Sequence, residues 1–308
     1  MGLEREGVIE DLGFYSSIDV SRILCFSSPR MYFEAKVSLT VERETVLPPF
    51  TGKVSKSLLI KGCDKLETVF KSPNINPKPI KVSPLGYLRN GREVYLWIRD
   101  GGKMDVTKAS PDREYFFYVG YEETVSHSVE EALSNIDGVE LFGTKWYISN
   151  IEINSYTLPS SKMSKYDISN STEVKVSFRS PVNIVDPYRK SRYRRFLPVA
   201  GFLFSYNIGE IARLERDNKL YWILIDYISA VLQETHNIWN TVKKIHYIYD
   251  GEKIPGLTGY IKYYINHDLL ENKPEITKLI ENILQHAEIM GVGSGRANGF
   301  GHVKITVK

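Results

Sequence analysis

The chain has 308 residues, of which 42% are apolar, and its formal net charge is +3. This length suits two domains of ordinary size, and the apolar content supports packed cores and excludes a disordered protein. Because the net charge is small, any nucleic-acid binding must rest on local basic patches. Cys25 and Cys63 lack the spacing of a zinc site or a disulfide framework, which favours a reducing, cytoplasmic location. The acidic start and the short apolar runs predict neither a signal peptide nor a membrane span.

The first half of the chain predicts one ferredoxin-like domain over residues 29–157, preceded by an N-terminal arm over residues 1–28. Alternating apolar residues predict a strand over 31–42, and Thr51 is the expected N-cap of a helix over 51–61. Further strands are expected over 80–82 and 114–121, with a hairpin at 89–92. Ser128-x-x-Glu131 predicts a capping box that opens a helix to residue 136, before a bulged strand over 139–156. This order is β-α-β-β-α-β.

The second half repeats the alternation after a polar, aperiodic linker over residues 158–172. Strands are expected over 174–179, 242–249 and 257–265, and helices over 196–206, 218–235 and 274–290. We therefore expect an α+β protein of two tandem ferredoxin-like (RRM-like, βαββαβ) domains, the second over residues 173–308.

The most distinctive stretch is the glycine-rich segment 291–301, in which five of eleven residues are glycine. It follows a predicted helix and leads into a short final strand. Consecutive N–H groups in such a turn can form an anion-binding nest, which points to a polyphosphate or a nucleic-acid backbone. Its spacing fits neither a P-loop nor a dinucleotide fingerprint. The alternative is a tight helix-to-strand turn that binds nothing.

A basic run covers residues 188–195. It contains five cations and two tyrosines without an acid, the cations being Arg189, Lys190, Arg192, Arg194 and Arg195. Lysine and arginine bind phosphates, and tyrosine stacks on unpaired bases, so the run predicts RNA contact. The alternative is a solvated loop whose charge only aids solubility.

The helix, the pattern Gly-hydrophobic-Gly-x-Gly-Arg-x-x-Gly-Phe-Gly and the final strand resemble the C-terminal loop of the repeat-associated mysterious proteins (RAMPs) of CRISPR systems. Among these the chain is most similar to the Cas6 family of CRISPR RNA-processing endoribonucleases. The resemblance implies metal-independent cleavage of CRISPR repeat RNA, with no cofactor, to 2′,3′-cyclic phosphate and 5′-OH ends. It implies repeat RNA or crRNA as partner, with other CRISPR effector subunits and a homodimer as further candidates. It also implies RNA binding by the loop residues Gly291, Gly293, Gly295, Arg296, Asn298 and Gly299.

The catalytic assignment rests on lysines, because no histidine lies at or just after the first helix, where many family members carry one. The chain resembles the archaeal, histidine-lacking members, in which two lysine-bearing motifs supply the site. The first motif matches Lys53-Val-Ser-Lys56 and the second matches Lys78-Pro-Ile-Lys-Val-Ser-Pro-Leu-Gly86. This assigns catalysis to Lys56 and Lys78, with Lys53 as their neighbour. An ammonium can stabilise phosphate charge and donate a proton, but it is a poor base near pH 7.

Three alternatives remain open at this point. The lysines are also typical of an exposed helix face and loop. A RAMP-fold subunit that holds crRNA in an effector complex without cutting it would carry the same glycine-rich segment. A ferredoxin-like enzyme that acts on a small phosphorylated ligand is the third alternative.

Overall fold

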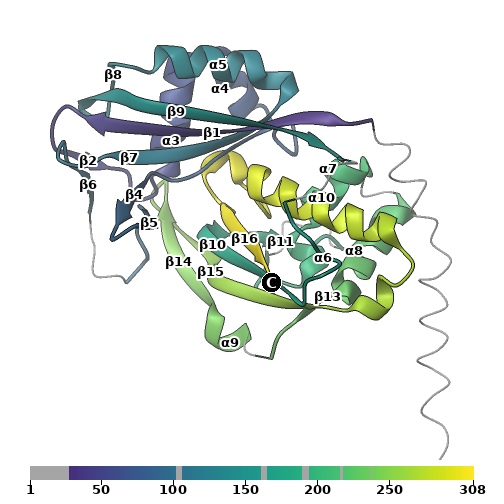
Figure 1. Ribbon diagram of the computed structural model, residues 1–308. Coiled ribbons are helices and arrows are strands. Elements are labelled where there is room, and N and C mark those ends of the chain that lie inside the picture. Colours follow the sequence, from purple (N-terminus) through teal and green to yellow (C-terminus); the bar gives the residue numbers. More distant parts are fainter. Residues whose placement is uncertain (1–27, 102–105, 161–164, 189–193, 216–217, 237) are drawn as a thin grey trace, which may run out of the picture.

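A computed structural model describes residues 28–101, 106–160, 165–188, 194–215, 218–236 and 238–308. Each half of the chain forms an antiparallel sheet with helices packed on it, and the two halves lie against each other (Figure 1). Almost all of the predicted N-terminal arm lies outside the described residues. Among the described residues, no helix is long and apolar enough to cross a membrane.

The N-terminal sheet has the strand order β5-β4-β7-β1-β9-β8, and β3 also pairs with β7. Its strands are β1 (Arg30–Val41), β3 (Ile80–Val82), β4 (Gly86–Arg89), β5 (Arg92–Tyr95), β7 (Tyr115–Glu122), β8 (Val139–Leu141) and β9 (Thr144–Leu158). The accompanying helices are α3 (Gly52–Gly62), α4 (Lys65–Lys71) and α5 (Ser126–Asn135), and β2 (Thr45–Leu47) pairs with β6 (Thr107–Ala109). The central strands β7, β1 and β9 follow the ferredoxin-like order, so the predicted fold of this half is confirmed.

The boundaries in this half show where local signals were misleading. The predicted capping box is wrong, because α5 starts at Ser126 after a short 3-10 turn and has no side-chain cap. Thr51 does precede α3, but its hydroxyl donates to the Leu96 carbonyl instead of capping the helix. The predicted bulged strand is a hairpin, since Phe142 and Gly143 adopt positive φ and turn the chain back on itself.

The C-terminal sheet has the order β13-β15-β10-β16, and β14 also pairs with β15. Its strands are β10 (Glu173–Val182), β13 (Leu232–Glu234), β14 (Val242–Tyr249), β15 (Glu252–Ile265) and β16 (Val303–Val307). The helices are α6 (Ala200–Leu203), α7 (Ser205–Ala212), α8 (Lys219–Val231), α9 (Ile238–Thr241) and α10 (Pro274–Met290). A small ribbon pairs β11 (Ile184–Val185) with β12 (Arg194–Arg195). The second ferredoxin-like order is thereby confirmed, and the fold class is α+β as predicted.

Two helices in this half differ from their predictions. The helix expected over 218–235 ends at Val231, because residues 232–234 extend to pair with β15. The helix expected over 196–206 is instead two short helices, α6 and α7, that meet at Phe204. Both regions are strongly apolar, so periodicity alone does not fix where each helix ends.

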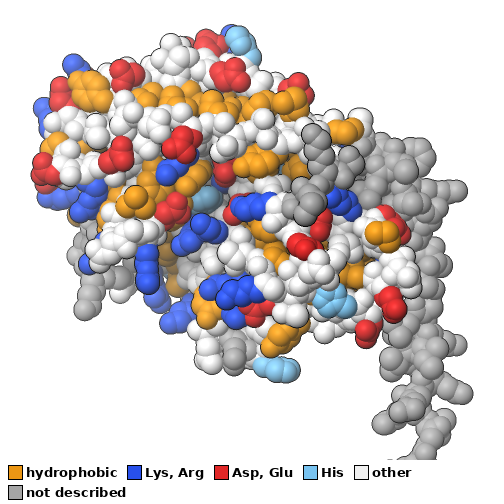
Figure 2. Space-filling model, viewed as in Figure 1, with side chains coloured by type: hydrophobic (Ala, Val, Ile, Leu, Met, Phe, Trp, Pro, Cys, Tyr) orange, Lys and Arg blue, Asp and Glu red, His pale blue; other side chains and the backbone are white. Residues whose placement is uncertain are grey.

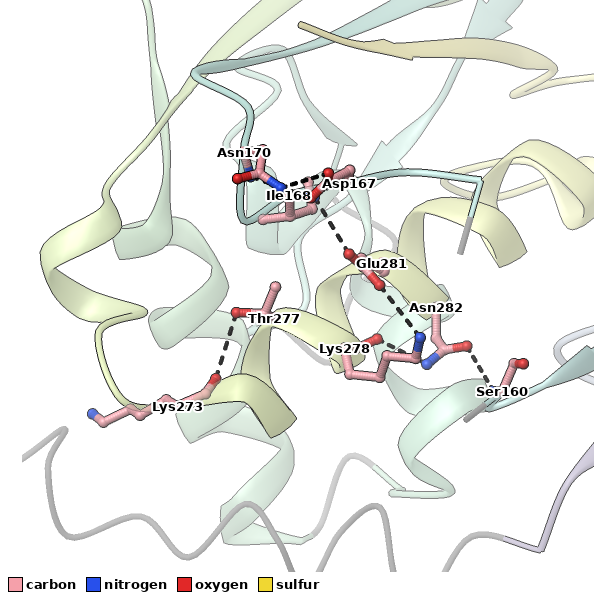
Figure 3. Close-up of polar contacts among 9 residues, drawn as sticks. All are labelled: Ser160, Asp167, Ile168, Asn170, Lys273, Thr277, Lys278, Glu281 and Asn282. Atoms are coloured by element: carbon pink, nitrogen blue, oxygen red, sulfur yellow. Dashed lines mark hydrogen bonds and ion pairs between the residues drawn. The ribbon is translucent and has the colours of Figure 1, made fainter. Parts of the chain in front are cut away.

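The segment predicted as a linker, residues 158–172, packs along α10 at both of its described ends (Figure 3). The Ser160 N–H donates to the Asn282 side chain at 2.9 Å, and the Ile168 N–H donates to Glu281 at 3.3 Å. Ile168 is fully buried in the C-terminal core. This connection is therefore fastened to the second half. The domain boundaries themselves stay a prediction.

Lys81 lies where the N-terminal sheet meets the end of α10. Its neighbour across the ladder is Gly120, where a Cβ would lie 2.0 Å from the Ile289 carbonyl oxygen, so only glycine allows this approach. The Lys81 side chain is fully buried, and its ammonium has no hydrogen-bond partner among the described residues. Burial lowers its pKa to about 8.

We expect Lys81→Met to stabilise the protein below pH 8. Because the unfolded chain holds this proton up to about pH 10.5 and the folded chain only to about pH 8, the wild type becomes more stable across that window. The gain from Lys81→Met is about 3 kcal/mol at neutral pH, from a pKa shift of about 2.5, and it disappears above the window. Urea unfolding at neutral pH and above pH 10.5 measures the difference in stability between Lys81→Met and the wild type. The exposed Lys145→Met is the control. A gain that does not change with pH would contradict this account.

Candidate active site

The first helix and the glycine-rich segment meet in direct backbone contact. At Gly52, the first residue of α3, a Cβ would lie 2.5 Å from the Asn298 carbonyl oxygen and 2.9 Å from the Gly299 Cα. Gly299 itself has a φ of +97°. Glycine at both positions therefore lets two segments that are distant in sequence pack without side chains between them.

This packing brings Lys56 to the glycine-rich segment. Its Nζ donates to the Asn298 Oδ1 at 2.9 Å, across 242 positions of sequence. The same ammonium lies 5.2 Å from the ring centroid of Phe70, on α4. The amide and the aromatic face together hold the lysine head in one place.

Charge and burial make Lys56 more acidic than an ordinary lysine. Partial burial lowers its pKa below 10.5, and Asp250 opposes that shift. The positive charge of Lys78 acts in the same direction as burial. A lysine with a lowered pKa releases a proton more readily while it still carries its positive charge near neutral pH.

Lys78 lines a cavity of about 180 Å³ beside the glycine-rich segment. The cavity is lined by Phe70, Asn76, Pro77, Lys78, Tyr206 and residues 293–298. The Lys78 ammonium donates to the Ser72 carbonyl, and partial burial lowers the pKa of this lysine too. The structure thus brings both predicted catalytic lysines to the glycine-rich segment.

Lys53 does not line this cavity. Its exposed side chain forms an ion pair with Asp250, in the turn between β14 and β15, at 2.7 Å. It therefore joins α3 to the C-terminal half and affects Lys56 only through its charge.

Arg296 is held by a carboxylate from α7. Its side chain is 5% exposed, one guanidinium nitrogen donates to the Glu210 Oε1 at 2.9 Å, and the other lies 2.9 Å from Oε2. The guanidinium also lies 5.8 Å from the Tyr206 ring centroid. This ion pair, with its one hydrogen bond, anchors the glycine-rich segment to α7. RNA contact by Arg296 stays a prediction.

The glycine-rich segment presents only part of itself to solvent. Positive φ is found at Gly291, Gly293, Gly295, Gly299 and Gly301. The N–H groups of Val292, Ser294 and Gly301 donate to protein carbonyls, so these three are not available to an anion as the nest hypothesis required. Gly295 is exposed, and Ser294 and Asn298 are half-buried, at the rim of the cavity. RNA contact by this segment would have to use that rim.

The predicted basic run is only partly described. Arg189, Lys190 and Arg192 lie outside the described residues. Arg195 pairs with the buried Asp186 at 2.8 Å, and Arg194 donates to the Pro255 carbonyl at 2.9 Å. Both arginines thus stabilise the ribbon of β11 and β12, and RNA binding by the run stays a prediction.

Three further residues of the site carry no recognisable motif. Phe70 and Tyr206 line the cavity, and Glu210, which like Tyr206 lies on α7, pairs with Arg296. Tyr206 and Glu210 are four residues apart, which places them on one face of that helix. That spacing is the only sequence signal they share, and it does not indicate what the face contacts.

Two buried histidines have structural partners. His286 on α10 faces the Asn207 amide at 3.0 Å, and burial lowers its pKa to about 4. His302 faces the Tyr95 hydroxyl at 2.9 Å. Neither lines the cavity that holds Lys78.

In Figure 2, Lys and Arg side chains gather where the N-terminal and C-terminal halves meet. The small net charge is therefore distributed unevenly, as a local basic patch requires. Among the described residues, no three His, Cys, Asp or Glu side chains are grouped so that they could hold a metal ion.

Comparison with known families covers most of the chain. The Cas6 N-terminal domain matches residues 33–156, and the family described as CRISPR-associated endoribonuclease Cas6 matches residues 176–303. The chain belongs to the Cas6 family. No curated protein sequence matches it.

Solved Cas6 structures share the fold of this Cas6 chain at low sequence identity. A Thermus thermophilus Cas6 product complex aligns with a TM-score of 0.58 and 13% identity, over 90% of this chain and 99% of the other. A Cas6-related protein of Pyrococcus furiosus aligns with a TM-score of 0.52 and 14% identity, over 89% and 98%. At such identities the likeness establishes the two-domain fold and leaves the site to be argued from this chain's own residues.

Proposed function

We propose that this Cas6 protein is a metal-independent endoribonuclease of the histidine-lacking, archaeal type, which processes CRISPR repeat RNA. The observation that carries the proposal is the hydrogen bond from Lys56 to Asn298, beside a cavity lined by Lys78. Lys78 lines a space large enough for a phosphate group, and the Lys56 ammonium is hydrogen-bonded to Asn298, another residue of that lining. Family membership supports RNA as the substrate, as do the product and substrate-mimic complexes of other Cas6 proteins.

The proposed reaction uses the RNA's own nucleophile. The 2′-oxygen attacks the adjacent phosphorus in line, its proton leaves to solvent, and the bond from phosphorus to the 5′-oxygen breaks. Lys56 gives its proton to the departing 5′-oxygen, and its lowered pKa favours that transfer. Lys78 stabilises the negative charge on the phosphorane. The two lysines supply the positive charge that a metal ion would otherwise provide, and the products are a 2′,3′-cyclic phosphate and a 5′-OH.

The proposed acid predicts a specific pH dependence. Cleavage should fall as pH rises through the pKa of Lys56, which burial places below 10.5. Asp250→Asn removes a charge that raises this pKa, so the descending limb of the pH–rate profile should move to lower pH. Single-turnover rates from neutral to alkaline pH measure the shift, with exposed Asp112→Asn as the control. A limb that does not move would remove Lys56 as the acid.

The test of the proposed function is cleavage of end-labelled repeat RNA in the presence of EDTA. We expect a product that ends in a cyclic phosphate. Tight binding without any product would instead select a non-catalytic RAMP-fold subunit that holds crRNA in an effector complex. Binding of a small phosphorylated compound, with RNA affinity independent of salt, would select the small-ligand alternative.

A further inference from the structure

A second and larger cavity adjoins the one beside the lysines. Its volume is about 640 Å³, and it shares Asn76, Pro77 and Tyr206 with the smaller cavity. The two spaces are therefore neighbours, with Tyr206 and the loop that carries Lys78 forming their common wall.

The part of the second cavity's lining that is not shared with the first includes two arginines. Arg30 begins β1, and Arg213 follows α7 with a φ of +53°, which turns its side chain out of the helical path. Both are exposed. Arg213 donates from two nitrogens to Ser28, so a guanidinium with five N–H donors keeps capacity for a further acceptor.

The two carboxylates that line the cavity differ in whether they are free to neutralise its arginines. Glu210 is committed to Arg296, with its carboxylate oxygens 2.9 Å from the guanidinium nitrogens. Glu215 is the other carboxylate that lines the space. Within the described lining, Arg30 and Arg213 thus outnumber Glu215, the one carboxylate that no arginine there neutralises, which favours an anionic occupant. Glu122, which does not line the space, also interacts electrostatically with Arg30.

Size separates the roles of the two cavities. A space of about 180 Å³ admits a phosphate group but not a whole nucleotide, whereas 640 Å³ lies within the ~300–1,000 Å³ of typical ligand sites. Because the phosphate of an RNA chain is joined to a nucleoside on each side, occupying the first space delivers a nucleotide to the second.

We propose that the second cavity is a subsite for the nucleotide next to the scissile phosphate. Arg30 and Arg213 bind the next backbone phosphate, and Tyr206 contacts the nucleoside between the two phosphates. This inference rests on the proposed function, since the lysine cavity defines where the scissile phosphate lies.

The test measures binding alone, so that it does not depend on cleavage. Repeat RNA with a 2′-deoxy residue at the cleavage position is prepared in three forms. The short form ends at the scissile phosphate, the second carries two more nucleotides on the 5′ side, and the third carries two more on the 3′ side. We expect one extension to raise wild-type affinity by at least about fivefold, within the range of one stacked base. Arg213→Gln should abolish that gain and leave the affinity of the short RNA unchanged. Tyr206→Leu should weaken the extended RNA more than the short one, because Tyr206 lines both cavities.

Salt dependence separates a phosphate contact from a change in folding. For the extended RNA, Arg213→Gln should reduce the slope of log Kd against log salt by about 0.7, the loss of one single-strand phosphate contact. Lys65→Gln, an exposed cation on α4 that pairs with Glu131, serves as the matched control. Equal affinity of all three RNAs for wild type would overturn the subsite, as would equal loss on short and extended RNA in both variants. A protein that never cleaves but still gains affinity from one extension would support the subsite and refute only the catalytic proposal.

Discussion

Lys56→Ala should reduce the single-turnover cleavage rate by about 10²–10⁴-fold, the usual contribution of a positioned proton donor. The loss should be in the rate at saturating RNA, while affinity changes by no more than a few-fold. The reason is geometric: the ammonium is held at the cavity by Asn298, and its replacement removes a proton donor without disturbing the backbone contact of Gly52. Rapid-quench kinetics and a binding titration on the same RNA measure the two quantities.

The same helix provides the control for this experiment. Lys61→Ala, in the last turn of α3, removes an exposed lysine and should leave the rate unchanged. Lys78→Ala should slow cleavage by a comparable factor through lost charge stabilisation. If Lys56→Ala and Lys78→Ala both cut at the wild-type rate, the reaction uses groups elsewhere and the site proposed here is wrong.

The fold could be predicted from sequence wherever one periodicity ran undisturbed. The alternation over residues 31–42 gave β1, and the helical pattern from Pro274 to Met290 gave α10 with the same bounds. Prediction failed where tertiary contacts decided the outcome. Leu232, Gln233 and Glu234 all have good helix propensity and could continue α8, but pairing with β15 satisfies their backbone instead. The hairpin at residues 142–143 needs positive φ at a phenylalanine, which no turn rule anticipates.

In the candidate site, too, local motifs could be predicted from the sequence and tertiary contacts could not. The two lysines and the glycine-rich segment could be located because each lies in a local motif. Their meeting point could not be predicted, since the Lys56–Asn298 bond joins residues 242 positions apart. The partner of Arg296 was also hidden, because Glu210 lies in a helix with no motif of its own. A side chain assigned to a ligand from its motif can therefore be engaged by the protein itself.

Arg296→Met should destabilise the protein by about 3–5 kcal/mol, the typical cost of removing one partner from a buried ion pair. Glu210 would keep its charge at 8% exposure and lose the guanidinium that compensates it. Urea unfolding of the free protein measures the change. Arg92→Met, at an exposed hairpin position, is the matched control and should change stability by less than about 0.5 kcal/mol.

The double variant Glu210→Met/Arg296→Met decides between an anchoring role and a ligand role for Arg296. If the pair only anchors the glycine-rich segment to α7, two apolar side chains of similar volume should recover most of the lost stability. Because Lys56 and Asn298 would then be held as before, RNA affinity and cleavage should recover with it. Recovered stability together with RNA affinity that stays lost would show instead that the guanidinium exchanges Glu210 for an RNA phosphate when substrate binds. Since a phosphate and a carboxylate present the same paired oxygens to an arginine fork, that exchange is the one chemistry that would reconcile the buried pair with direct RNA contact.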